Sequence, residues 1–131
     1  MKVLALDYGS ARTGVAVSDP TGTVARPLEV VQRAGSESGL ARIVELVREH
    51  GAERVVVGLP LTMRGERGEQ AAETEAFVSL LREALEVPVE SFDERFTTDL
   101  AEQSGGVGET DARAAAHLLS SYLTWSSSAP R

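Results

Sequence analysis

The feature that most constrains the fold of this chain is the run of residues 3–10, VLALDYGS, in which four apolar side chains lead into Asp7. An uninterrupted apolar run predicts a strand buried on both faces, as in α/β proteins whose sheets are covered by helices. A carboxylate directly after such a strand is held rigidly at the edge of the sheet. Gly9 then lets the backbone turn away and leaves room for a ligand to approach. Asp7 is therefore a candidate functional residue.

The rest of the chain predicts short strands first, and then alternating helices and strands. The predicted strands cover residues 2–7, 13–19, about 23–31, 54–59 and 87–92, and the predicted helices cover about 40–50, 69–86 and 109–124. Gly51 is placed to end the first helix, and Ala84 is expected on the inward face of the second. The element order βββαβαβα predicts an α/β fold with a mixed five-stranded sheet, strand order 3-2-1-4-5, and helices on both faces.

Length and hydropathy predict a single compact unit. The chain has 131 residues, so residues 1–124 are expected to form one domain and the Ser-rich residues 125–131 a flexible tail. No apolar run is long enough to span a membrane. The first strand begins at once, without a basic region and an apolar signal core, so a cytoplasmic location is expected.

The topology is expected to gather unusual residues at one edge of the sheet. Strands joined through helices run parallel, and ligands in open α/β sheets bind beyond the carboxyl ends of such strands. The segments that follow the first, fourth and fifth strands are residues 7–10, 60–68 and 93–98. Asp111, at the start of the last helix, is expected to join them, because the small side chains of Ala114 and Ala115 let that helix approach the sheet closely.

This edge predicts a metal site. The acidic candidates are Asp7, Glu94 (with Asp93 as the alternative) and Asp111. Converging carboxylates are costly to hold together unless a divalent cation neutralises them. With no cysteine and two histidines in the chain, the expected cation is one that prefers oxygen ligands, Mg²⁺ or Mn²⁺. Two such ions about 3.5–4 Å apart are a known arrangement for phosphodiester cleavage, in which Asp7 would be the bridging ligand.

Basic and hydroxyl side chains near the same edge are candidate phosphate contacts, since guanidinium groups bind phosphate in a bidentate manner. They are Arg12, Arg64, Arg95, Thr97 and Thr98. The formal net charge of −7 argues against electrostatic binding of nucleic acid. Residues 36–94, however, carry thirteen acidic and six basic residues. Much of the acidic excess therefore belongs to two predicted helices whose outer faces can lie far from a substrate.

Each candidate also has an ordinary structural explanation. Asp7 could serve only as a turn cap, and Asp93 and Glu94 could be plain loop charges. Asp111 could be an acidic residue favoured by the helix dipole in a first turn. The single tryptophan, Trp125, could equally pack the last helix against the sheet or stack on a base.

Four motifs, found in order along nearly the whole chain, resemble one family. They are LALDYGSARTGVAVSDPTG, VVVGLPLTMRGERG, FDERFTT and DARAAAHLLSSYL. They resemble the YqgF/RuvX family, the Holliday-junction-resolvase-like branch of the RNase H-like superfamily. The resemblance implies an RNase H-like fold and a divalent-metal nuclease that matures the 5′ end of pre-16S rRNA, or in some members resolves Holliday junctions. The family's acidic site would fall on Asp7, Glu94 and Asp111.

Two positions depart from the family pattern. Residues 102–108 carry no positive charge where the family is rich in lysine and arginine, and Thr62 replaces a common asparagine. Two other functional classes remain open: a nucleotide-binding domain of the actin and hexokinase type, and a catalytically silent module that binds a partner. The choice between RNA and DNA and between Mg²⁺ and Mn²⁺ also remains open, and a symmetric cut of a junction would call for a homodimer.

Overall fold

The computed structural model describes residues 1–61, 64, 68–96 and 110–128, except for the side chains of Phe96, Thr110, Asp111 and Ser128. Its sheet has five strands: β1 (Val3–Asp7), β2 (Arg12–Ser18), β3 (Ala25–Gln32), β4 (Arg54–Leu59) and β5 (Val89–Asp93). Their order in space is β3-β2-β1-β4-β5. The first three strands pair antiparallel, whereas β1, β4 and β5 run parallel. This confirms the predicted α/β fold and strand order.

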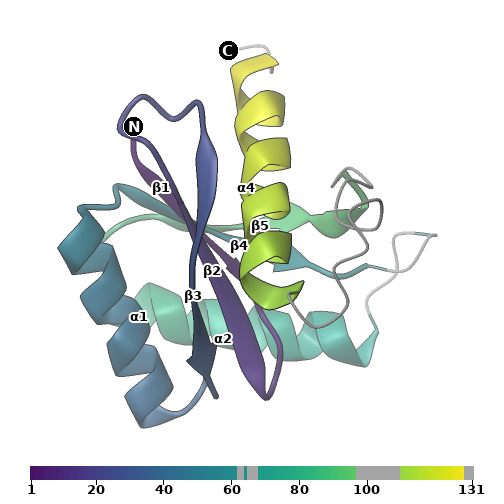
Figure 1. The fold of residues 1–131 in the computed structure, drawn as a ribbon. Coiled ribbons are helices and arrows are strands. Elements are labelled where there is room, and N and C mark those ends of the chain that lie inside the picture. Colours follow the sequence, from purple (N-terminus) through teal and green to yellow (C-terminus); the bar gives the residue numbers. More distant parts are fainter. Residues whose placement is uncertain (62–63, 65–67, 97–109, 129–131) are drawn as a thin grey trace.

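Helices cover both faces of the sheet (Figure 1). They are α1 (Glu37–His50), α2 (Glu69–Ala84) and α4 (Thr110–Ser128), and a 3₁₀ turn, η1 (Glu94–Phe96), follows β5 directly. Helix α4 crosses one face of the sheet, and α1 and α2 lie behind the other face. No helix among the described residues is long and apolar enough to cross a lipid bilayer.

The two faces of the sheet form two separate parts of the core. Leu4 and Leu6 of β1 pack with Ile43 of α1 and Phe77 of α2. The alternate residues of the strand, represented by Ala5, pack with α4. Since successive strand residues point to opposite faces, a strand buried on both sides must be apolar throughout. This accounts for the uninterrupted apolar run before Asp7.

Helix α1 starts at Glu37, before the expected residue 40, and ends at His50, as expected. The Ser36 hydroxyl accepts a hydrogen bond from the Gly39 backbone N–H at 3.1 Å, which caps the helix N-terminus. Gly51 ends the helix in the left-handed conformation, with φ of 62°, which glycine adopts without steric cost. This C-terminal cap confirms the predicted role of Gly51.

The other two helices differ from the sequence-based expectation. Helix α2 ends at Ala84 rather than at residue 86, and Ala84 is exposed, whereas Thr74 and Val78 are buried beside Phe77. Helix α4 continues to Ser128, beyond the expected end at residue 124. Its last turns are held by aromatic packing, because the ring of Trp125 lies 5.6 Å from that of Phe92.

Strand boundaries also shift by a few residues. Strand β5 starts at Val89 rather than at residue 87, because Pro88 has no N–H to donate to the ladder. The Pro88 carbonyl still accepts from the Val55 N–H at 2.9 Å. Strand β5 is an edge strand, as expected for a strand next to a proline. Strand β3 starts at Ala25, because the Asp19 side chain holds the preceding turn by accepting from Val24 N–H at 2.8 Å.

Candidate functional site

Asp7 ends β1 at the edge of the sheet where the parallel strands finish. It lies opposite Gly14 of β2, and the alternation of the strand places it on the same face as Ala5, the face that α4 covers. The turn that follows is tightly fixed. The buried Thr13 hydroxyl accepts from the Gly9 N–H at 3.4 Å and donates to the Gly9 carbonyl at 3.3 Å. A Cβ on Gly9 would lie 2.5 Å from the Arg12 carbonyl oxygen, so no larger residue fits this turn.

Glu94 reaches Asp7 from the far side of β4. It is the first residue of η1, immediately after β5, and its side chain forms a hydrogen bond with the side chain of Asp7. Strand β4 lies between β1 and β5. The Glu94 side chain must therefore extend across β4 for the two carboxyl groups to meet.

This contact has a clear electrostatic consequence. Burial of Glu94 raises the pKa of its carboxyl group, and the nearby charge of Asp93 acts in the same direction, while the hydrogen bond with Asp7 opposes them. Two carboxyl groups in hydrogen-bond contact must share a proton, unless a cation takes its place. The pair is therefore well suited to exchange a proton for a metal ion.

Asp93, the alternative acidic candidate, is engaged elsewhere. Its carboxylate accepts from the Arg95 backbone N–H at 2.9 Å and from Arg95 Nη2 at 2.6 Å. These hydrogen bonds hold the pKa of Asp93 below its usual range. The same interaction occupies the Arg95 guanidinium, so a phosphate would have to compete with Asp93 for it.

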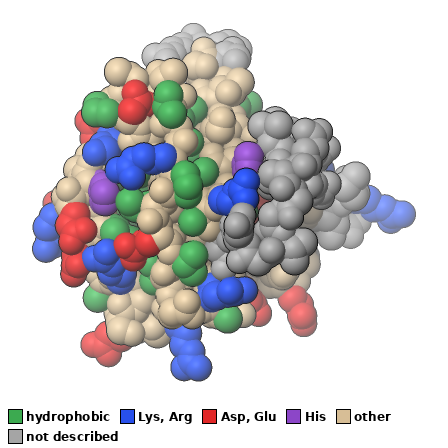
Figure 2. Space-filling view, in the orientation of Figure 1, with side chains coloured by type: hydrophobic (Ala, Val, Ile, Leu, Met, Phe, Trp, Pro, Cys, Tyr) green, Lys and Arg blue, Asp and Glu red, His purple; other side chains and the backbone are tan. Residues whose placement is uncertain are grey.

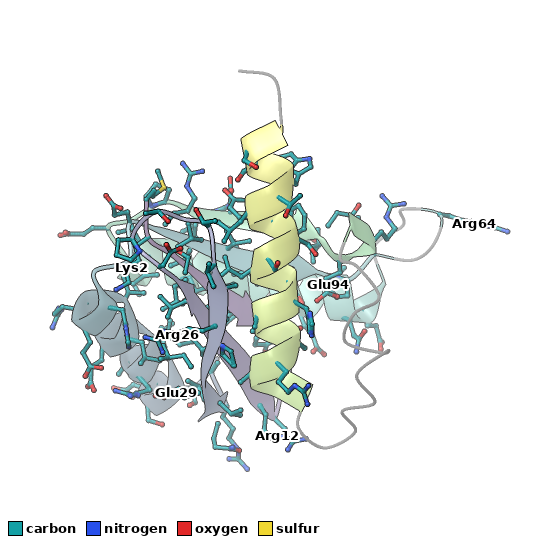
Figure 3. The ribbon with its side chains drawn as sticks, turned by 45° about the horizontal axis from the view of Figure 1, so that its top comes forward. Lys2, Arg12, Arg26, Glu29, Arg64 and Glu94 are labelled. Carbon is teal, nitrogen blue, oxygen red and sulfur yellow. The ribbon has the colours of Figure 1, made fainter. Side chains whose placement is uncertain are left out.

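The remaining predicted site residues are spread more widely. Arg64 is exposed and points away from Glu94, and Arg12, the first residue of β2, lies well apart from both (Figure 3). Asp111 lies by its backbone in the first turn of α4, and its side chain is outside the described part of the structure. Thr97 and Thr98 are also outside it, as are Thr62 and residues 102–108. Within the described ranges, no three His, Cys, Asp or Glu side chains form a group that could hold a metal.

An open cavity of about 210 Å³ adjoins the two carboxylates. It is lined by Asp7, Tyr8, Gly9, Ser10, Pro60, Gln70, Glu73, Thr74 and Glu94. The Tyr8 ring stacks on Phe77 with centroids 4.4 Å apart, which ties this cavity to the core. Expectations from sequence missed the contribution of α2. The helical spacing of Gln70 and Thr74 from the inward Phe77 is the signal that indicates it.

The described surface over α1 and the adjoining strand β3 carries mixed charge. Figure 2 shows positive and negative side chains intermingled on the left of this face. One example is Arg42, which pairs with Glu29 at 2.7 Å and with Glu49 at 3.6 Å. Positive charge in this area is therefore partly balanced by local partners.

Comparison with solved structures identifies the fold. The structure resembles Thermus thermophilus RuvC in complex with a Holliday junction substrate, with a TM-score of 0.64 and 18% identity, over 97% of this chain and 95% of that one. The fold is thus the RuvC-like RNase H fold that the motifs predicted.

Comparison of sequences identifies the family. A protein named "Putative pre-16S rRNA nuclease" from Chloroflexus aurantiacus is 54% identical over 101 residues, which are 77% of this chain and 66% of that protein. A protein of the same name from Desulforudis audaxviator is 41% identical over 94% of both chains. The model of the RuvX family, described as Holliday junction resolvase, matches residues 1–125. The chain therefore belongs to the RuvX family.

Proposed function

We propose that this protein is a divalent-metal-dependent endonuclease that cleaves phosphodiester bonds in structured nucleic acid, with 5′-end processing of pre-16S rRNA as its reaction. The observation that carries the proposal is the contact between the Asp7 and Glu94 carboxyl groups. It lies at the carboxyl ends of parallel strands, where α/β folds bind ligands. The proposed substrate, pre-16S rRNA, is taken from the names of the related proteins.

The residues at this edge fit a divalent cation. The donors are carboxylate oxygens, the ligands that Mg²⁺ and Mn²⁺ prefer. Burial raises the pKa of Glu94, and a divalent cation between the two carboxyl groups would take the place of the proton that they share. Asp7 and Glu94 would hold the metal, and we propose Asp111, from the first turn of α4, as the third ligand. When bound, one or two ions would activate a water molecule and neutralise charge on the phosphate.

The chain's own residues would orient the substrate around these ligands. The Asp7 backbone is held by its pairing in β1 and by the turn at Gly9, so its carboxylate starts from a fixed point at the edge of the sheet. The open cavity beside it offers access for a backbone phosphate. Guanidinium groups would contact neighbouring phosphates. We assign that role to Arg12, Arg64 and Arg95, together with the hydroxyls of Thr97 and Thr98.

A second candidate function is resolution of four-way DNA junctions, which the description of the family model favours. This reaction would require two sites related by symmetry, and hence a homodimer. A catalytically silent module that binds nucleic acid or protein is a third candidate. A cytoplasmic location remains a prediction, and it is consistent with the proposed processing of rRNA.

The test is cleavage of two labelled substrates, a precursor-rRNA 5′ fragment and a four-way DNA junction, with Mn²⁺, with Mg²⁺ and with chelator. The proposal expects cutting of the rRNA fragment that requires metal and is lost in Asp7→Asn. Glu83→Gln, an exposed acidic position on α2, is the matched control and should cut normally. Cutting of the junction alone would favour the second function. Cutting at the wild-type rate by Asp7→Asn, or in chelator, would contradict the proposed mechanism.

A further inference from the structure

Gly58 lies near the end of β4, where the backbone conformation gives no reason for a glycine. Among the described glycines, positive φ angles occur at Gly22 (72°) and Gly51 (62°), and Gly58 is not one of them. A glycine inside a strand weakens the strand, and it commonly marks a place where another group approaches closely. The explanation for Gly58 must therefore lie in the space that a side chain would occupy.

That space is filled by the side chain of Glu94. A Cβ built on Gly58 would lie 2.7 Å from Glu94 Oε1 and 3.0 Å from Glu94 Cγ. The same Cβ would also lie 3.1 Å from Leu118 Cδ2 of α4. The glutamate side chain thus passes directly over Gly58 and is bordered by Leu118.

The strand order explains why this passage matters. Asp7 is on β1, Glu94 follows β5, and β4 lies between them. Neighbouring strands are about 4.8 Å apart, so the two positions are separated by roughly 10 Å. Gly58 is on the same face of β4 as Val56, which packs toward α4. A side chain at position 58 would stand in the path along which Glu94 reaches Asp7.

We propose that Gly58 is a positioning residue for the metal site, because the absence of its side chain lets the Glu94 carboxylate cross β4 to Asp7. The metal part of this inference rests on the proposed function, whereas the steric part rests on geometry alone. Strand β4 is held by β1 on one side and β5 on the other. The flexible end of Glu94 is therefore the group that would move when a methyl group is added.

The first test is Gly58→Ala, with Mn²⁺ affinity measured by calorimetry. The variant should fold, and its dissociation constant for Mn²⁺ should rise by about tenfold or more, as for the loss of groups that orient metal ligands. Gly68→Ala is the matched control, because a Cβ on Gly68 would meet no other atom within 4 Å. This variant should leave the Mn²⁺ affinity unchanged. An unchanged affinity in Gly58→Ala would overturn the proposal.

A double-mutant cycle shows whether Gly58 acts through Glu94. Glu94→Ala removes both Oε1 and Cγ, the two glutamate atoms that the new methyl group would meet, and leaves Leu118 Cδ2 as the third neighbour. In that background Gly58→Ala should cause no further loss of Mn²⁺ affinity, whereas an equal loss in both backgrounds would overturn the proposal. If Gly58→Ala alone does not fold, folding of the double variant supports the steric conflict with Glu94. Failure of the double variant to fold assigns the conflict to Leu118 and contradicts the proposal.

Crystal structures of metal-free wild type and Gly58→Ala separate this inference from the proposed function. The expected result is a Glu94 carboxylate displaced from Asp7 in the variant, with β4 unchanged. A retained Asp7–Glu94 contact would overturn the inference. If the wild type binds no Mn²⁺, the proposed metal site fails, and the comparison of the two crystal structures alone decides the role of Gly58.

Discussion

At the scale of single residues, the Glu94 carboxyl group combines partial burial with contact to a second acidic side chain. Burial raises its pKa, so the metal-free fold favours the protonated form. A carboxyl group whose pKa is raised on folding stabilises the fold below its unfolded pKa, and this stabilisation is lost as pH rises through the folded pKa. Binding of the proposed metal would remove the same proton, which would link the stability of the fold to the site.

This linkage predicts the pH dependence of stability. In the absence of metal, the melting temperature of the wild type should fall as pH rises from the usual glutamate range through the raised pKa of Glu94. Glu94→Gln keeps the shape of the side chain but cannot ionise, so this part of the fall should disappear. Thermal unfolding over a pH series, with chelator present, measures the difference. Identical pH profiles for the two proteins would refute the raised pKa.

At the scale of elements, local patterns predicted which face of each helix is buried better than they predicted where each helix ends. Helix α1 has strong signals at both ends, Ser36 and Gly51, and its end matches the prediction. Helix α4 has no comparable local stop at residue 124. Its continuation depends on packing of Trp125 against Phe92 and Tyr122, with ring centroids 5.6 and 6.0 Å apart. The contact between Trp125 and Phe92 joins distant parts of the chain and leaves no local periodic signal.

The cap of α1 can be tested directly. Ser36→Ala removes the acceptor for the Gly39 N–H and should lower the free energy of unfolding by about 1 kcal/mol, within the usual range for N-cap serines. Ser79→Ala on α2 is the control, because its hydroxyl donates to the Glu75 carbonyl within the helix and caps no end. Urea unfolding of both variants gives the comparison. Equal stability of Ser36→Ala and wild type would show that the cap contributes nothing.

At the scale of the whole molecule, the topology brings together the end of β1 and the end of β5, and with them Asp7 and Glu94, and the sequence was sufficient to expect this. The order of elements alone placed the ends of β1, β4 and β5 at one edge of the sheet. The place of Glu73 beside the cavity and the passage of Glu94 over Gly58 could not be expected from sequence, although the helical spacing of Thr74 from Phe77 indicates that α2 contributes. The cavity lining depends on how α2 packs against the sheet. The passage over Gly58 depends on β4 lying between Asp7 and Glu94.

The net charge of −7 predicts a shallow dependence of substrate binding on salt. With three candidate guanidinium contacts, the slope of log K against log salt should be no steeper than about −3. Arg64→Ala should reduce that slope by about one, while Arg48→Ala, exposed on α1, should not change it. Fluorescence anisotropy of a labelled rRNA fragment with the Asp7→Asn protein measures binding without cleavage. A steep slope that is insensitive to Arg64 would place the contact surface elsewhere.

The central claim is that Asp7 and Glu94 act together as one metal-dependent catalytic site. The most direct test is the single-turnover rate of rRNA-fragment cleavage with Mn²⁺ for wild type, Asp7→Asn, Glu94→Gln and the double variant. Groups that act as a unit are non-additive, so each single substitution should remove nearly all activity and the double variant should lose little more. A Glu94→Gln protein that cleaves at the wild-type rate would contradict the claim.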